Sequence, residues 1–210
     1  MVTLRPPERL PYTGVDEADR LLARDPLALL IGFALDQQVP LQKAFGGPLE
    51  LQRRLEERLD AARLAAMDPD ELARVFSRPP ALHRFPSAMA ARVQALCQAV
   101  LRSYGGDPTR IWTEAKDGAD LRARLLELPG IGEMKADTIV AVLARRFGLR
   151  LAGLDAVLPD HPTLGDVDSP ETLAVYQSAK RAHKAALRAG LTPDEAWRVA
   201  QAGREPAPHR

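Results

Sequence analysis

LELPGIGEMKADTIVAVLARRFG, residues 126–148, is the stretch that decides the fold of this chain. It contains the end of one apolar helical segment, a short turn with two glycines, and the start of a second helical segment. Gly130 and Gly132 adopt backbone torsions that other residues resist, so the pair predicts a tight hairpin between two helices. The second helix is expected over residues 133–147, with Gly148 as its stop.

A hairpin of this kind exposes several backbone N–H groups together. The positive end of the second helix dipole lies at the same place, so the turn formed by Gly130, Ile131 and Gly132 predicts a site for an anion such as a DNA phosphate. Neutral amides need no net positive charge to bind it. The alternative is an ordinary turn that only connects two packed helices.

The chain before the hairpin also has helical patterns. Asp25 and Pro26 match the N-cap and first position of a helix that opens the apolar run LALLIGFALDQQV. Gly46 and Gly47 are expected to end the turn that follows, and Pro48 to begin a helix reaching residue 67. Further helices are expected over residues 68–76, 86–106, 107–113, 118–128 and 170–189, and a last short one after residue 192.

Length and composition fit a helical globular protein. The 210 residues are 46% hydrophobic and 27% charged, and no segment alternates as a strand does. We therefore predict an all-α fold with two closely packed helical lobes. The expected organisation is an N-terminal segment over residues 1–24, the main domain over 25–190, and a C-terminal helix with a frayed tail over 191–210.

Several classes of protein are excluded by what the sequence lacks. No apolar run is long enough to span a bilayer, and the first residues have no hydrophobic core of a secretory signal, so we expect a cytoplasmic, nucleoid-associated protein without a membrane partner. The lone Cys97 excludes an internal disulfide, a four-cysteine zinc site and an iron–sulfur cluster, and it is expected in the core. His83 and His161 lack metal-ligand spacing, so we expect no metal and no other cofactor.

The net charge of +1 gives little support to DNA binding, but the distribution of charge does. Basic residues gather after the hairpin's second helix and again on the helix expected over residues 170–189. They predict a basic face, and the alternative is a solvated helix surface. The two clusters are Arg145, Arg146 and Arg150, and Lys180, Arg181, His183, Lys184 and Arg188.

The hairpin sequence resembles the helix-hairpin-helix signature of the base-excision DNA glycosylase superfamily (HhH-GPD), with the small Ala136 where that hairpin packs its helices. Two further segments agree in order and separation. LDQQVPLQKA, residues 35–44, resembles the glutamine-bearing segment of alkyladenine-type glycosylases, and residues 83–100 resemble the helix between it and the hairpin. The resemblance covers about residues 25–190 and points to a compact bacterial branch of the superfamily.

This resemblance implies an enzyme of base-excision repair that binds double-stranded DNA and extrudes a damaged or mispaired base. Bifunctional members carry a lysine nucleophile two residues after the second glycine, where this chain has Met134. Lys135 is one residue further, about 100° around the helix, so we expect it to face phosphate or solvent. The resemblance therefore implies a monofunctional glycosylase, which we expect to be a monomer.

A carboxylate that stabilises the developing sugar cation is expected in the loop after the hairpin's second helix. Asp155 lies at the distance that the resemblance implies, and Asp160 is the second candidate because LPD resembles the alkyladenine-type sequence. One of them should point into a cleft that faces the hairpin; the alternative for each is a surface turn residue. Asp166 and Asp168 are expected to cap the helix that opens at Pro170.

Gln38 is a candidate wedge that fills the gap left by an extruded base, and its alternative is a plain helix-terminal residue. Trp112, Phe85 and Tyr104 could stack on such a base, but their spacing favours the core. Two other functions stay open. One is a non-catalytic DNA-binding module that recognises distorted duplex, and the other is a hairpin used for protein–protein contact.

Overall fold

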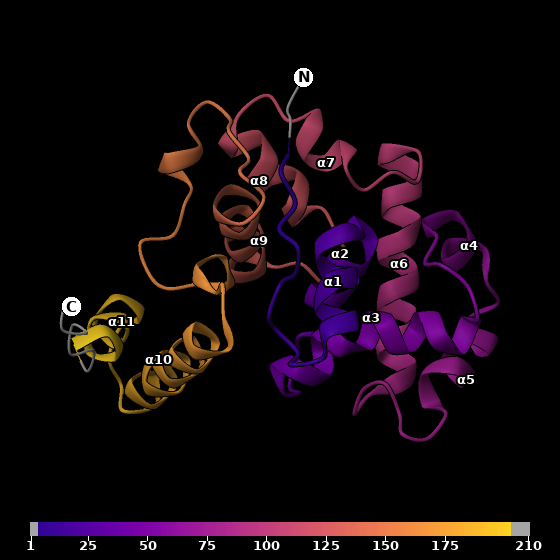
Figure 1. The fold of residues 1–210 in the computed structure, drawn as a ribbon, viewed down its shortest axis with the longest axis horizontal. Helices are drawn as coiled ribbons and strands as arrows, with labels where there is room; N and C mark the ends of the chain where they lie inside the picture. The colour runs from indigo at the N-terminus through magenta and orange to yellow at the C-terminus, as the bar shows by residue number, and fades with distance from the viewer. Residues whose placement is uncertain (1–3, 203–210) are drawn as a thin grey trace.

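The computed structural model describes residues 4–202, and over this range every regular element is a helix. The predicted all-α class is confirmed, and Figure 1 shows how the helices are arranged. They are α1 (Asp16–Arg24), α2 (Pro26–Leu35), α3 (Leu41–Leu55), α4 (Ala61–Ala66), α5 (Pro69–Ser77), α6 (Pro86–Tyr104), α7 (Arg110–Thr113), α8 (Gly118–Leu126), α9 (Glu133–Arg145), α10 (Pro170–Arg188) and α11 (Pro193–Ala202), with 3-10 turns at Leu154–Ala156 and Leu164–Asp166.

Helix α2 is central, and it begins as its sequence predicts. Asp25 accepts hydrogen bonds from the backbone N–H groups of Leu27 (2.8 Å) and Ala28 (3.1 Å), and Pro26 occupies the first turn. Every residue from Leu27 to Leu35 is buried. A helix that is apolar on all sides requires cover on all sides, and α1, α3 and α6 supply it.

Helix α3 corrects the expectation of a break at Gly46 and Gly47. The helix runs through both glycines and Pro48, and it ends at Glu56, whose φ of 56° is left-handed. The reason is the packing of α3 against α2. A Cβ on Gly47 would lie 2.6 Å from Leu35, so the glycine permits close contact of the two helices and does not end α3. The remaining helix of the expected segment is α4, which Asp60 caps.

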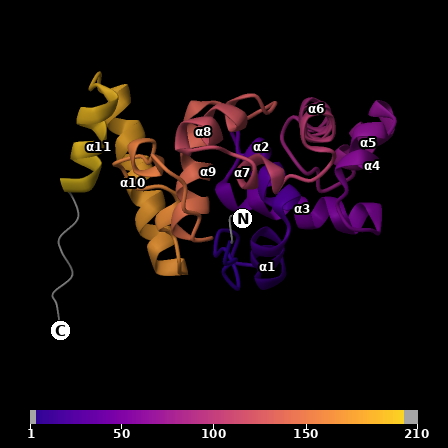
Figure 2. The same cartoon turned by 90° about the horizontal axis from the view of Figure 1, so that it is seen from above.

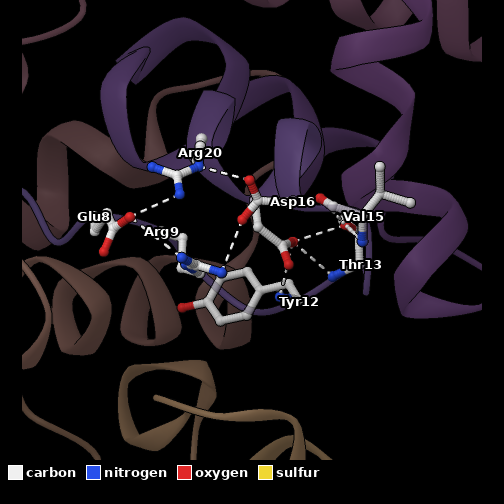
Figure 3. A network of polar contacts seen from close by, with 8 residues as sticks. Glu8, Arg9, Tyr12, Thr13, Val15, Asp16 and Arg20 are labelled. Atoms are coloured by element: carbon white, nitrogen blue, oxygen red, sulfur yellow. Dashed lines mark hydrogen bonds and ion pairs between the residues drawn. The ribbon is translucent and has the colours of Figure 1, made fainter.

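Helix α1 is an element that the sequence analysis did not predict. The segment before it folds back on the helix through polar contacts, drawn in Figure 3. Asp19 accepts from the N–H of Thr13 (2.9 Å), and Arg20 pairs with Asp16 (2.7 Å). The buried Tyr12 donates its hydroxyl hydrogen bond to the carbonyl of Leu164, 2.8 Å away. Residues 4–24 therefore share the core with the rest of the helices.

Helices α8 and α9 flank the hairpin, as residues 126–148 predict. Ala136 is fully buried at their junction, and the segment from Thr138 to Ala144 is buried throughout. The long loop after α9 then returns along the helix. A Cβ on Gly165 would lie 2.7 Å from the carbonyl of Ala141, so the loop rests directly on the α9 backbone.

Helices α10 and α11 pack on each other at the side of the molecule opposite α4 and α5 (Figure 2). Ser169 caps α10 by accepting from the N–H of Thr172 (3.2 Å). The expectation that Asp166 and Asp168 cap this helix is wrong. Asp166 instead accepts from the N–H of Thr163, and Asp168 accepts from the hydroxyl of Thr172 and not from a backbone N–H of α10. Within residues 4–202, no helix combines the length and apolar character needed to cross a membrane.

Candidate functional site

The hairpin, residues 128–136, has the open amides that its sequence predicts. Gly130 has a left-handed φ of 88°, and Gly132 is the exposed N-cap of α9. None of the described residues accepts a hydrogen bond from the backbone N–H of Gly130, Gly132, Glu133 or Met134. These amides meet at the positive end of a thirteen-residue helix, which is an arrangement that binds anions.

Ile131 corrects one part of that prediction. Its side chain is buried at 4% exposure, and its N–H donates to the carbonyl of Leu128 at 3.0 Å. The residue therefore anchors the hairpin in the core and offers no free amide. Burial of this large apolar side chain is favourable, and this explains why it lies in the core although the glycines on either side belong to an open turn.

The loop between α2 and α3 faces the hairpin and is held there by side chains of the α6 region. The buried His83 contacts the carbonyl of Gln37 through Nε2 (2.9 Å) and accepts from the N–H of Phe85. Burial lowers the pKa of His83, which favours its neutral form. Arg92 donates to the Gln37 side chain and also packs across Gly130, where a Cβ would lie 2.7 Å from its Cδ.

Gln38, the candidate wedge, is exposed in this loop beside the hairpin. Its φ of 55° is left-handed, a conformation that costs free energy for a residue with a side chain. The contacts of His83 and Arg92 with its neighbour Gln37 fix the loop in this form. The structure thus brings Gln38 and the hairpin to the same face of the molecule, and its role as a wedge stays a prediction.

Lys135 corrects the expectation that it faces phosphate or solvent. Its ammonium group donates to the carbonyls of Gly130 (3.0 Å) and Ala34 (3.5 Å), so it joins the hairpin to the end of α2. Desolvation lowers the pKa of Lys135, the negative charge of Asp36 opposes this by raising it, and the charges of Arg92 and Lys180 lower it further. Met134, at the position of the lysine nucleophile in bifunctional relatives, is 69% exposed. The two carbonyls are a stronger attraction for the ammonium than the solvent at the helix surface.

A cleft opens beside the hairpin, between the ends of α2 and α9 and the side of α10. Its outer basin, about 640 Å³, is lined by Asp36, residues 38–42, Met134, Lys135 and one face of α10. An inner chamber of about 140 Å³ continues beneath it. The chamber walls are mostly apolar and aromatic, and they include Phe33, Thr138, residues 161–164, Tyr176, His183, Leu187 and Trp197.

The charges that line this cleft are mainly positive. Four cations, Lys135, Lys180, Arg181 and Lys184, contribute to its lining, and Asp36 is the one carboxylate among the described lining residues. Arg181 and Lys184 are exposed and have no ion-pair partner among residues 4–202. The basic face expected on this helix is therefore present in part. His183 does not contribute to this face, because it is 6% exposed and lines the inner chamber.

The floor of the chamber is an aromatic stack contributed by three segments. Trp197 of α11 lies between His161 (centroids 4.5 Å apart) and His183 (4.1 Å), with all three rings nearly parallel. Burial lowers the pKa of His183, and the nearby His161 lowers it further. The stack ties α11 and the loop to α10, so the chamber depends on all three.

Asp155 and Asp160 do not lie across from the hairpin, which corrects their expected placement. The turn that carries Asp155 rests on the first residue of α8, because the Gly118 N–H donates to the carbonyl of Ala152 (2.9 Å). The hairpin follows the other end of α8. Asp160 lies beside Arg145 in the last turn of α9, roughly 18 Å along that helix from the hairpin. The loop turns back along α9 because Gly165 fits against its backbone.

The other aromatic and sulfur-containing candidates are mostly in the core. Trp112 and Tyr104 are buried, as their spacing predicts, whereas Phe85 is 43% exposed beneath the guanidinium of Arg84. Cys97 is fully buried, and burial raises the pKa of its thiol to about 12. Over the described part of the chain, no three His, Cys, Asp or Glu side chains gather as metal ligands.

Sequence reasoning missed Asp36 and Tyr176 as cleft residues. Asp36 stands beside Gln38 in LDQQVPLQKA, but only Gln38 was predicted as a site residue there. A signal was available, because Asp favours the start of a helix and Asp36 follows an apolar helical run. Tyr176 carried no signal, since tertiary packing alone brings α10 to the cleft.

Comparison of the chain with protein-family models gave no match, and neither a curated protein nor a solved structure matched it. The superfamily resemblance of the sequence therefore stays a prediction.

Proposed function

We propose that this protein binds duplex DNA through the hairpin and excises a damaged or mispaired base that enters the cleft, as a monofunctional DNA glycosylase with an HhH-GPD fold. The observation that carries the proposal is the juxtaposition of free amides and free cations. The amides of Gly132, Glu133 and Met134 lack acceptors within residues 4–202, and Arg181 and Lys184 line the adjoining basin. Phosphates bind to both kinds of group, so one DNA backbone can contact both.

The near-neutral net charge is compatible with this proposal. Amides at a helix N-terminus bind phosphate without a formal charge, and only a few lysines and arginines are needed to complete the site. The affinity for duplex should therefore fall with salt on a shallow slope, because few counterions are released. The inner chamber supports the second step, since its aromatic and apolar walls suit the planar face of a base.

The sharpest test of the amide contact is Glu133→Pro compared with Glu133→Ala. Glu133 is the first residue of α9, and its N–H has no acceptor in the described part of the chain, so proline removes that N–H without breaking a helix hydrogen bond. The extended ψ of −179° at Gly132 suits a following proline. Alanine removes the same carboxylate and keeps the N–H. We expect Glu133→Pro to bind every duplex about tenfold more weakly than Glu133→Ala.

Equal affinity of these two variants, with circular dichroism showing both folded, would contradict the amide contact. Excision is tested separately with short duplexes that each carry one alkylated, deaminated or oxidised base. Release of a free base from one of them is expected. Release from none would remove the enzyme part of the proposal and leave DNA binding intact.

The monofunctional part is tested by borohydride, which traps a covalent adduct between a lysine and the sugar. We expect no trapped adduct, because the Lys135 ammonium is engaged by the carbonyls of Gly130 and Ala34. An adduct that disappears in Lys135→Met would show that this lysine is the nucleophile.

A second function, a non-catalytic module for distorted duplex, is favoured by one observation. Asp155 and Asp160, the carboxylates that the resemblance implies, lie away from the hairpin. This module would bind mismatched or kinked duplex more tightly than regular duplex and release no base. The same panel of duplexes separates the two functions.

A further inference from the structure

Asp36 occupies a position in the cleft that no other carboxylate shares among the described lining residues. It ends α2, and its side chain is 20% exposed at the border between the outer basin and the inner chamber. The Lys180 ammonium lies 3.9 Å from Oδ2 and also 5.6 Å from the centroid of the Tyr176 ring. A nucleotide entering the chamber from the basin would pass this carboxylate.

Helix capping does not explain an aspartate at this position. Asp25, Asp60, Asp68 and Asp117 each cap the N-terminus of a helix, where they accept backbone hydrogen bonds. Asp36 lies instead at the C-terminal end of α2, where the helix dipole disfavours a negative charge. No described residue donates a hydrogen bond to its carboxylate, so its acceptor capacity is free.

We propose that Asp36 is the catalytic carboxylate of base excision, an inference that rests on the proposed function. Among the described residues it is the carboxylate that lines both the basin, which the hairpin residues Met134 and Lys135 share, and the chamber, whereas Asp155 and Asp160 line neither. Asp36 is unfavourable for its helix, accepts no hydrogen bond from the described residues, and is engaged only by the ion pair with Lys180 at the mouth of the chamber. A ligand that develops positive charge there explains a carboxylate at this place.

The chemical step balances with water as the only co-reactant. The bond between C1′ of the sugar and the base nitrogen breaks, and its electron pair leaves with the base. Asp36 stabilises the resulting positive charge on the sugar. A water molecule then forms the new bond to C1′ and gives a proton to the Asp36 carboxylate, from which it passes to solvent. The departing base takes one proton from solvent, so the overall reaction is hydrolysis.

The test compares Asp36→Asn with Glu127→Gln on a duplex whose base the wild type releases. Glu127 is exposed at the end of α8, so its variant removes a negative charge beside the hairpin without altering the cleft. We expect the single-turnover rate of base release to fall at least about a hundredfold in Asp36→Asn and to stay near the wild-type rate in Glu127→Gln. Duplex affinity of Asp36→Asn should be equal or higher, because a negative charge near the phosphates is lost.

A melting temperature of Asp36→Asn close to that of the wild type is also expected. The amide removes an unfavourable charge at the end of α2 and also a partly exposed ion pair with Lys180, and these two small effects oppose each other. A clear drop in melting temperature together with the loss of rate would assign Asp36 a structural role and overturn the proposal.

Normal base release by Asp36→Asn overturns the inference alone, and a hundredfold loss in Asp155→Asn or Asp160→Asn would then return the chemistry to the loop. If the wild type releases no base from any duplex in the panel, the proposed function fails and the role of Asp36 fails with it. The failure of the inference is therefore distinguishable from the failure of the function.

Discussion

The two ends of helix α9 differ in the pairing of two arginines at one end and of the hairpin amides at the other. At the C-terminal end, Arg145 donates to both carboxylate oxygens of Asp166 at 2.7 Å, and Arg150 donates to the carbonyls of Ala144 and Leu149. At the N-terminal end, the amides of Gly132 and Glu133 have no acceptor among the described residues. The cleft cations lie at this second end.

This difference shows that clustered charges in a sequence do not by themselves identify a binding face. Arg145 and Arg150 lie five residues apart, and Arg181 and Lys184 lie three residues apart. The first pair is used within the fold, whereas the second has no ion-pair partner among residues 4–202. What separates the two ends is whether the protein already supplies the opposite partner. A ligand gains most binding free energy where it does not have to displace a partner that the protein already supplies.

The largest expected effect separates the two hairpin glycines. Gly130→Ala should lower the free energy of unfolding by about 1–3 kcal/mol, because an alanine resists the left-handed φ of 88° and its Cβ would contact Arg92. Gly132→Ala should change it by less than about 0.5 kcal/mol, because Gly132 has an ordinary φ of −93° and open space for a Cβ. Chemical denaturation measures both.

For duplex binding, the important glycine should be Gly132, whose substitution is expected to have the smaller effect on stability. Gly132→Leu is expected to fold normally and to weaken binding to all duplexes, because its side chain occupies the space before the free amides. Unchanged affinity in Gly132→Leu would break the assignment of the hairpin end as the DNA-binding end.

The next effect compares cations at the two ends. Lys184→Gln should weaken duplex binding severalfold and reduce the slope of log affinity against log salt by about one, because an exposed lysine of the cleft is lost. Arg145→Gln should leave both quantities nearly unchanged, since Asp166 already neutralises Arg145. A larger loss in Arg145→Gln would place the DNA at the other end of α9.

The smallest effect concerns pH. Burial lowers the pKa of His83 below its usual value of 6.5, so the unfolded chain takes up a proton before the folded protein does. The free energy of unfolding should therefore decrease as the pH falls below about 6.5. The decrease should be shallower in His83→Asn, with a remainder from His183, whose pKa burial also lowers. Arg145→Gln serves as the control, and a wild-type slope in His83→Asn would contradict the account.

Local signals in the sequence were sufficient for the elements that local physics determines. Asp25 and Pro26 identify the start of α2, and Gly130 and Gly132 identify the hairpin, because caps and left-handed torsions depend on neighbouring residues alone. Gly47 could not be interpreted in this way. Whether a glycine ends a helix or admits a neighbouring helix depends on what packs there, which is Leu35 in this fold.

The candidate site was less predictable because a loop and α10 complete it from a distance. The number of residues between α9 and Asp155 or Asp160 does not determine the direction in which the loop runs. In the structure the loop carries both aspartates away from the hairpin end of α9. Asp36 is close to Gln38 in sequence, but the chamber beside it is formed only when Tyr176 and Trp197 arrive from α10 and α11.

The central claim is that DNA contacts the hairpin end of α9, and backbone amide NMR during titration with an undamaged duplex tests it most directly. The account predicts that the amide signals of Gly132, Glu133 and Met134 shift most, together with those around Lys184, while the amides of Asp155 and Asp160 hardly move. Shifts concentrated around Asp155, Asp160 and Arg145, with the hairpin amides unchanged, would contradict it.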